Sequence, residues 1–283
     1  MSSVASVPPL ACTVRDCALP IERRERVYVC ARGHSYDIAR SGYVNLLQPQ
    51  DRRSLNAGDS KDAVEARAAL LEVGVGGTLI DAVADKILAL DLPERPVIVD
   101  LGSGTGDALA AIGHRHEVLG IGIDLSVPAA EYAARRFPDH LWIVANADRR
   151  LPLVDRAVDV VLSVNGRRNP DEVARVLATH GALVMALPAP DDLIELRTHV
   201  QGAGVERDRG DTMIAAHPAF TVVERATIRE TLTLDRGALR HLLRGTYRGV
   251  RLREAERMAD IERMSVTLAS DIFVMTKPHK ESQ

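Results

Sequence analysis

A glycine-rich segment near residue 100 gives the first indication of chemistry in this chain. An apolar run that begins at Val97 ends at Asp100, and the sequence then reads Leu-Gly-Ser-Gly-Thr-Gly-Asp. Glycine has no Cβ, so a loop of this composition lets a bound ligand approach the backbone closely. Residues 107–112 have the pattern of a helix start. The segment therefore predicts a strand, a ligand-binding loop and a helix in succession.

The spacing of the three glycines indicates which ligand the loop suits. A dinucleotide-binding loop follows Gly-x-Gly-x-x-Gly, and its third glycine lies where the helix packs on the strand. That position is Asp107 in this chain. The glycines instead follow Gly-x-Gly-x-Gly, shortly after the acid Asp100. This arrangement resembles motif I of class I S-adenosylmethionine-dependent methyltransferases.

Two later apolar runs also end in polar residues that suit a nucleoside. The run from Val118 ends at Asp124, where a carboxylate can accept hydrogen bonds from both ribose hydroxyls. The run from Leu141 leads into polar residues at the expected rim of the adenine site. For Asp148 alone, a helix cap or a solvated loop is an equal alternative. The predicted cofactor-binding residues are Asp100, Gly102, Gly104, Gly106, Asp107, Asp124, Leu125, Asn146, Ala147 and Asp148.

All three cysteines of the chain lie near its N-terminus. Cys12 and Cys17 form a Cys-x4-Cys pair, and Cys30 and His34 form a Cys-x3-His pair. Three thiolates and one imidazole make a complete tetrahedral zinc set. A disulfide would leave one cysteine over and would need an oxidising compartment, and three unrelated buried thiols are the other alternative. We predict one structural zinc ion without a catalytic role, because protein ligands fill all four positions.

Composition limits the remaining possibilities. The 283 residues suffice for one medium domain and a small one. No run of about twenty apolar residues is present, so no membrane span is expected. The first residues lack the charged start and apolar core of a signal peptide. We therefore expect a cytoplasmic protein with reduced thiols. The net charge of −3 does not by itself indicate a nucleic-acid-binding protein.

The order of apolar runs and turn residues predicts an α/β fold. We expect a class I methyltransferase sheet, doubly wound and mostly parallel, from residue 97 to about 187, with a small N-terminal zinc-binding module. Helices are expected at 61–73 and 79–90, and further strands at 220–225, 227–234 and 265–276. The expected division is a flexible tail (1–10), a zinc-binding RNA-recognition module (11–50), a linker with helices (51–90) and an S-adenosylmethionine-dependent methyltransferase domain (91–283).

Arginines are concentrated in two segments. Between residues 15 and 53 they outnumber the acids, and between 236 and 253 no acid occurs. Arg236, Arg240, Arg244 and Arg248 recur every four residues, which places them along one face of a helix. Such a row can bind successive phosphates or can be an ordinary solvated face, and both interpretations stay open. Gly245 and Gly249 indicate that the helix ends there.

The longest specific match begins at the proposed zinc ligand His34. The segment reads His34-Ser-Tyr-Asp-Ile-Ala-Arg-Ser-Gly-Tyr-Val-Asn-Leu-Leu47. It is similar to His-x-Phe-Asp-x-Ala-x-x-Gly-Tyr-Val-Asn-Leu-Leu of the 23S rRNA guanine-N1 methyltransferases. Further matching features are the zinc set, Gly58-Asp-Ser60, Ala66-Arg67, motif I, Asp124-Leu-Ser and Arg168-Asn-Pro170. The resemblance covers most of the chain.

This resemblance implies methyl transfer from S-adenosylmethionine to N1 of a guanine in a 23S rRNA hairpin. Some members confer resistance to macrolides such as tylosin, and the resemblance implies a homodimer; no membrane association is expected, because the chain has no long apolar run. The fourth strand ends at Asn165, where substrate contacts occur in this fold, and Asn165 is the predicted orienting residue for the base. Arg167 and Arg168 either hold a phosphate or base carbonyl or lie in a solvated loop. The zinc module is expected to bind the RNA hairpin through Arg23, Arg24, Arg26 and Arg32.

Three departures from the family pattern affect the expected site. Val75 and Gly76 stand where the family has His-Tyr, whose tyrosine is thought to touch the cofactor. Asp192 stands where a histidine often precedes Leu-x-Glu-Leu, and the first cysteine pair is wider than usual. These changes put cofactor affinity and the exact target base in question. The sequence identifies no general base, because its one candidate, Asp148, is assigned to the cofactor.

Two other functions are compatible with the sequence. One is a methyltransferase that acts on a small molecule, with a purely structural zinc module. The other is a non-catalytic RNA- or ribosome-binding protein that kept the fold. The intact motif I and Asp124 argue against the second, because a protein without a working cofactor site need not keep them.

Overall fold

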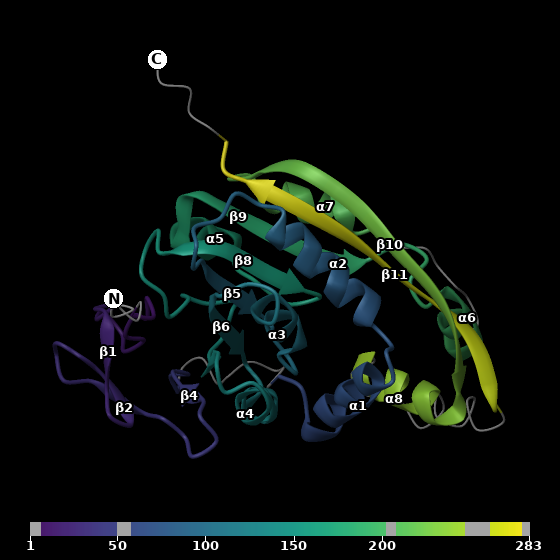
Figure 1. Cartoon of the computed structure of the whole chain (residues 1–283), viewed down its shortest axis with the longest axis horizontal. Helices are drawn as coiled ribbons and strands as arrows, with labels where there is room; N and C mark the ends of the chain where they lie inside the picture. The colour runs from purple at the N-terminus through teal and green to yellow at the C-terminus, as the bar shows by residue number, and fades with distance from the viewer. Residues whose placement is uncertain (1–6, 50–57, 202–207, 247–260, 279–283) are drawn as a thin grey trace.

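The computed structural model describes residues 7–49, 58–201, 208–246 and 261–278. Its centre is a sheet in which six neighbouring strands run parallel and two run antiparallel, in the order β10-β11-β9-β8-β5-β6-β7-β4 (Figure 1). The strands of this sheet are β4 (Val44–Asn45), β5 (Val97–Leu101), β6 (Leu119–Asp124), β7 (Leu141–Val144), β8 (Val158–Val164), β9 (Leu177–Pro188), β10 (Thr221–Asp235) and β11 (Arg263–Thr276).

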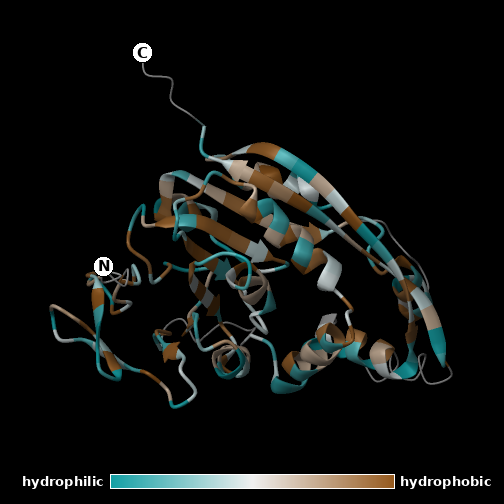
Figure 2. Ribbon diagram, in the orientation of Figure 1, coloured by the Kyte–Doolittle hydropathy of each residue, from teal (hydrophilic) through white to brown (hydrophobic). Residues whose placement is uncertain are grey.

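Both faces of the parallel part of the sheet are covered, which explains its nearly continuous apolar strands (Figure 2). In β5, Ile98 packs into the core on one face, while Val99 and Leu101 pack into the core on the other. The first face is covered by α2 (Gly77–Leu88), α3 (Asp107–Gly113) and α4 (Val127–Arg136). The second face is covered by α5 (Pro170–Val176), α7 (Gly210–Ala215) and the N-terminal module. The predicted mostly parallel α/β sheet is confirmed.

The last two strands form one long antiparallel hairpin. We expected separate strands at 220–225 and 227–234, and this prediction is wrong, because β10 pairs with β11 throughout 221–235. Ala226 continues the ladder opposite Ile272, and only a bulge between Val222 and Glu224 interrupts it. The hairpin extends past the sheet to α6 (Ile194–Gln201) and α8 (Arg236–Thr246) (Figure 1). It therefore brings α8 next to α1 (Lys61–Glu72).

The linker helices form where the sequence places them. The hydroxyl of Ser60 accepts a hydrogen bond from Ala63 N and begins α1, as a serine N-cap does. Gly74 and Gly76, both with positive φ, separate α1 from α2. The rest of the predicted linker, residues 50–57, lies outside the described residues.

The N-terminal module is joined to the sheet. Its own three-stranded sheet comprises β1 (Ile21–Arg24), β2 (Val27–Cys30) and β3 (Ser35–Asp37). Strand β4 then pairs in parallel with β7. Leu10 is 1% exposed and bridges Leu153, so buried structure begins before residue 11. The module and the main sheet share one hydrophobic core. In the described part of the chain, no helix has the length and apolar character needed to cross a membrane.

Candidate active site and zinc site

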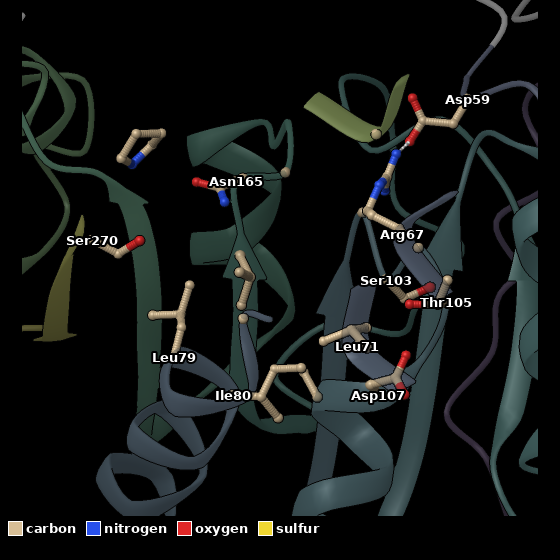
Figure 3. Close-up of a pocket in the computed structure, with 18 of the residues that line it drawn as sticks. Asp59, Arg67, Leu71, Leu79, Ile80, Ser103, Thr105, Asp107, Asn165 and Ser270 are labelled. Atoms are coloured by element: carbon tan, nitrogen blue, oxygen red, sulfur yellow. Dashed lines mark hydrogen bonds and ion pairs between the residues drawn. The ribbon is translucent and has the colours of Figure 1, made fainter. Parts of the chain in front are cut away.

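A cavity of about 680 Å³ opens at the carboxyl ends of β5, β6, β8 and β9. This volume lies in the usual range for small-molecule sites, and the carboxyl edge of the sheet is the usual place for them. Figure 3 shows the side chains of α1, α2 and the strand ends around it. All of the predicted cofactor-binding residues except Gly106 line this cavity.

The glycine-rich loop forms the floor of one half of the cavity. Gly102 has a φ of +77°, and a Cβ there would lie 2.9 Å from Gly166 Cα. Gly104 has a φ of +53°, and its backbone N–H donates to Asp124 Oδ2 at 2.9 Å. Glycine is therefore required at 102 by close packing and favoured at both positions by backbone conformation.

Gly106, the third glycine of the loop, packs against a neighbouring strand. A Cβ at this position would lie 2.5 Å from the ring of Trp142, and its φ is +87°. The residue is the N-cap of α3 and lets that helix approach β7. Gly106 does not line the cavity, and its contact with the cofactor stays a prediction.

Asp100 lies at the end of β5 and is almost completely buried, with 2% of its surface exposed. Within the described residues, its Oδ1 has no hydrogen-bond partner. Burial, assisted by the nearby charge of Asp124, raises the pKa of Asp100 to about 8. A buried acceptor without a partner in a ligand cavity suits a cationic hydrogen-bond donor.

Asp124 is the last residue of β6, and its carboxylate accepts hydrogen bonds from the glycine-rich loop and from the turn after β6. Its Oδ2 accepts from Gly104 N, and its Oδ1 accepts from Ser126 N at 2.8 Å. Burial raises the pKa of Asp124, and these two hydrogen bonds oppose the increase. Each oxygen has a second lone pair, so the carboxylate can still accept from a diol. Leu125 follows it in the cavity wall.

Three of the predicted cofactor-binding residues, Asn146, Ala147 and Asp148, follow β7. Asn146 Oδ1 accepts from Asp148 N at 3.0 Å, which holds this turn in shape. The Asp148 carboxylate forms an ion pair with Arg167 Nε at 2.8 Å. These residues and Ala147 form one side of the cavity.

The other half of the cavity lies at the ends of β8 and β9 and against the middle of β11, where Leu268 and Ser270 line it. Asn165 has a φ of +55°, and its backbone N–H donates a hydrogen bond to Ala186 O. The Asn165 amide and the Ser270 hydroxyl both lie at the cavity in Figure 3. Asn165, the predicted orienting residue, therefore lines the cavity.

Arg167 and Arg168 have separate environments. Arg167 is exposed and lines the cavity. The Arg168 side chain is turned inward, where it donates to Gly166 O at 2.9 Å and to His217 Nε2 at 3.3 Å. Burial lowers the pKa of Arg168 to about 10. Arg168 therefore supports the loop and does not line the cavity.

Two cavity residues were missed as site residues in the sequence. Arg67 pairs with Asp59 above the glycine-rich loop (Figure 3), and its NH1 lies 3.2 Å from the position of a Cβ on Gly104. Asp192 lies in the loop after β9 and also lines the cavity. Both entered the sequence analysis only through the family pattern, because nothing in their local sequence indicates that they reach the cavity.

The predicted zinc ligands are brought together in the N-terminal module. One ligand atom from each of Cys12, Cys17, Cys30 and His34 lies within 4.8 Å of all the others. Cys17 Sγ and Cys30 Sγ are 3.9 Å apart, and His34 Nδ1 is 3.4 Å from both Cys12 Sγ and Cys30 Sγ. Tetrahedral zinc with Zn–S bonds of about 2.3 Å separates its ligand atoms by roughly 3.5–3.8 Å. The donor set therefore fits a structural zinc ion.

Fold and site together define a class I S-adenosylmethionine-dependent methyltransferase with an N-terminal zinc ribbon. Residues 11–55 match the family model "RlmA, N-terminal", a zinc ribbon, and residues 98–183 match the model "Methyltransferase domain". A Bacillus halodurans protein described as a methyltransferase has the same fold, with a TM-score of 0.52 and 14% identity over 70% of this chain and 99% of that one.

Two curated relatives identify the family. The 23S rRNA (guanine(748)-N(1))-methyltransferase of Streptomyces fradiae is 38% identical over 79% of this chain and 80% of its own. A Bacillus subtilis protein, YxjB, assigned as a 23S rRNA guanine-N1 methyltransferase, is 34% identical over 83% of this chain and 84% of its own. This chain belongs to the 23S rRNA (guanine-N1)-methyltransferase family.

Proposed function

We propose that this protein transfers a methyl group from S-adenosylmethionine to N1 of a guanine in a 23S rRNA hairpin. The observation that carries the proposal is the continuous cavity that joins the glycine-rich loop to the ends of β8 and β9 and the middle of β11. S-adenosylmethionine bound beside the glycine-rich loop and a guanine base bound in the other half would lie in the same cavity. The curated relatives supply the class of acceptor.

The cofactor half offers a partner for each part of S-adenosylmethionine. Asp100 would accept from the ammonium group, and Asp124 from the ribose hydroxyls. Asp148 and Ala147 would contact the adenine, while the Arg67 guanidinium would bind the carboxylate. The Oδ1 of Asp100, which has no partner among the described residues, and the position of Arg67 NH1 beside Gly104 support this fit. When bound, the cofactor supplies an electrophilic methyl group on a sulfonium sulfur.

The acceptor half must receive a base that has left its stack. Enzymes that act on bases extrude them into a pocket, and RNA loops present the bases most easily extruded. Asn165 is the proposed orienting residue, because its amide can donate to guanine O6 or accept from N1–H. Much of the acceleration would come from alignment of N1 with the methyl group.

The zinc module would bind the RNA backbone. Arg23, Arg24, Arg26 and Arg32 are all exposed on it. Three of them donate to backbone carbonyls, Arg23 to Glu25 O, Arg26 to Ile38 O and Arg32 to Asp16 O. Guanidinium groups held in this way can bind phosphates at a lower entropic cost.

The arginines of α8 form a second candidate surface. Leu242 and Gly245 line the cavity, so α8 is part of its wall. Arg240 and Arg244 are exposed on the same helix. Arg248, Arg251 and Arg253 lie outside the described residues. An RNA that covers the cavity would therefore meet arginines on α8.

The test uses 23S rRNA from a strain that lacks this modification. Incubation with the protein and S-adenosylmethionine should create one strong reverse-transcription stop, because an N1 methyl group removes the Watson–Crick donor of guanine. The stop should lie in a hairpin loop. A modification of another base, or none, would contradict the proposal. Since 23S rRNA is cytoplasmic, the proposal also places the enzyme there.

Two finer parts of the proposal have separate tests. If the modified hairpin contacts macrolides, expression of the gene in a sensitive strain should raise the inhibitory concentration of tylosin. The homodimer implied by the family resemblance should give twice the chain mass in light scattering.

A further inference from the structure

We propose that the carboxylate of Asp192 accepts the N1 proton of the target guanine. The inference rests on the proposed function, because it names the proton acceptor which that reaction requires. Guanine N1 carries a hydrogen at neutral pH, so N1 must lose a proton as it gains the methyl group. A base within hydrogen-bond reach typically accelerates such a step by about 10²–10⁴-fold.

A continuous set of backbone contacts places Asp192 beside the acceptor half of the cavity. Asn165 N donates to Ala186 O on β9, and Ser270 on β11 is paired with Pro188 of β9. Ala269, which directly precedes Ser270 in β11, donates its N–H to Asp192 Oδ1 at 2.9 Å. Adjacent strands lie about 4.8 Å apart. Asp192 is therefore held beside Ser270 in the middle of β11, across β9 from Asn165, which follows β8.

The neighbouring Asp191 provides an internal contrast. It forms two hydrogen bonds with Arg229 on β10, at 2.9 and 3.1 Å, and this pairing lowers its pKa. Asp191 does not line the cavity, whereas Asp192 does. Burial raises the pKa of Asp192 to about 6. Two adjacent carboxylates with opposite shifts indicate different roles, and the one in the cavity suits a base near neutral pH.

The charged groups around Asp192 are compatible with this role. Arg197, which donates to Pro190 O, lowers the pKa of Asp192 by its charge. Asp191 and Glu195 raise it, and Glu195 is itself bonded to Thr267 on β11. Glu230 on β10 and Arg209 also line the cavity. The balance leaves Asp192 largely ionised at pH 7–8.

Most other acids of the cavity are occupied or lie on the cofactor side. Asp59 pairs with Arg67, Asp148 pairs with Arg167, and Asp124 holds two backbone N–H groups. Asp100 and Asp107 belong to the glycine-loop half. Glu230 is the one rival on the acceptor side among the described residues.

The step balances without a further reactant. The N1–H bond breaks, its proton moves to a carboxylate oxygen of Asp192, and the electron pair stays on the guanine. The N1 lone pair then forms a bond to the methyl carbon, while the carbon–sulfur bond breaks and its electrons go to sulfur. The products are 1-methylguanine in the RNA, S-adenosylhomocysteine and a protonated Asp192, which releases its proton to solvent.

The experiment compares single-turnover rates of the wild-type protein and Asp192→Asn on 23S rRNA between pH 5 and 9. Asparagine keeps an acceptor for Ala269 N–H but is not a base at these pH values. The wild-type rate should rise tenfold per pH unit and level off above about pH 6. Asp192→Asn should be at least about 100-fold slower at pH 7.5 and should lack this inflection. Its affinity for S-adenosylhomocysteine should stay within twofold.

Three further variants make the result specific. Asp192→Glu keeps a base, so it should recover a large part of the rate even if the asparagine variant folds poorly. Asp191→Asn should leave the rate at pH 7.5 unchanged and should keep the inflection, which can move only to lower pH because the charge of Asp191 raises the pKa of Asp192. A rate within threefold of wild type in Asp192→Asn, or equal loss in the Asn and Glu variants, would overturn the inference. Loss confined to Glu230→Gln would transfer the role to that residue. If the wild type itself makes no 1-methylguanosine, the proposed function has failed instead.

Discussion

Arg67 of α1 pairs with Asp59 directly above Gly104 of the glycine-rich loop. The pair links the segment before α1 to the cofactor half of the cavity. Asp59 is itself fixed by Ser126 Oγ, which donates to its backbone oxygen at 2.7 Å. The Arg67 Nε is buried and has no hydrogen-bond partner among the described residues. A guanidinium in this position is suited to the carboxylate of the cofactor's amino-acid group.

Replacement of Arg67 should therefore affect one part of the cofactor selectively. In Arg67→Gln, the affinity for S-adenosylhomocysteine should fall roughly 10- to 100-fold, the usual effect of removing a hydrogen bond to a charged group. The affinity for methylthioadenosine, which lacks the carboxylate, should stay within twofold. Calorimetric titration measures both. The exposed Arg135 of α4 provides a matched control as Arg135→Gln. Equal weakening of both ligands would contradict the assignment.

Cofactor binding should release a proton from Asp100. Its pKa of about 8 keeps this carboxyl largely protonated at pH 7 without ligand, while an ammonium group favours the ionised form. Affinity for S-adenosylhomocysteine should therefore increase with pH up to about 8. At pH 7 the binding enthalpy should differ between buffers of different ionisation enthalpy. An enthalpy independent of the buffer would argue against the Asp100–ammonium contact.

The same carboxyl should reduce stability as pH rises. Its folded-state pKa lies above the ordinary value of 3.8, so the folded protein binds more protons than the unfolded chain between these two pKa values. Ionisation of Asp100 therefore costs stability between pH 4 and 8. Asp100→Asn removes this cost. Its melting temperature, relative to that of wild type, should be higher at pH 8 than at pH 5.

Zinc removal should destabilise the whole protein and not the N-terminal module alone. Leu10, Cys12 and Ile21 share one core with Leu151 and Leu153 of the main domain. Elemental analysis should find one zinc ion per chain, and a strong chelator should lower the melting temperature in a single calorimetric transition. The variant Cys30→Ser should behave in the same way. Two separate transitions, with the second unchanged, would show that the module folds independently.

Charge reversal on the two arginine surfaces should weaken RNA binding only. The double variants Arg23→Glu/Arg24→Glu and Arg240→Glu/Arg244→Glu should each bind RNA less tightly. For every phosphate that is no longer neutralised, the logarithmic salt dependence of binding should fall by about 0.7–0.9. Affinity for S-adenosylhomocysteine should not change.

A control for these variants lies on the opposite side of the molecule. Arg95 precedes β5 and Arg115 follows α3, so both are at the amino edge of the parallel strands, away from the cavity. Arg95→Glu/Arg115→Glu should bind RNA as wild type does. If this control weakens binding as much as the other two variants, the effect is one of net charge.

The parts of the fold predicted well were those with local signals. The apolar runs that end at Asp100 and Asp124 identify buried parallel strands, and four zinc-ligand side chains at suitable spacing indicate one cluster. The continuous strand β10 was predicted as two, because its outer face alternates in polarity and its continuity depends on pairing with β11. Gly106 could not be distinguished from its neighbours, since its function depends on Trp142 from another strand.

The acceptor half of the site was harder to predict for a similar reason. Asp192 reaches the cavity through a loop after β9 and is held by Ala269 of β11. In the cofactor half, Arg67 likewise reaches the glycine loop from α1, a helix that precedes β5 in the chain. Such contacts connect segments far apart in the chain, so no short motif contains them.

The most direct test of the central claim is identification of the methylated nucleoside. The purified protein, with bound zinc verified, would be incubated with labelled S-adenosylmethionine and protein-free 23S rRNA from a strain without this modification. The RNA would then be digested to nucleosides. We predict that the label elutes as 1-methylguanosine, at no more than one methyl group per rRNA. Label in another nucleoside, or no label from a protein that binds S-adenosylhomocysteine, would contradict the account.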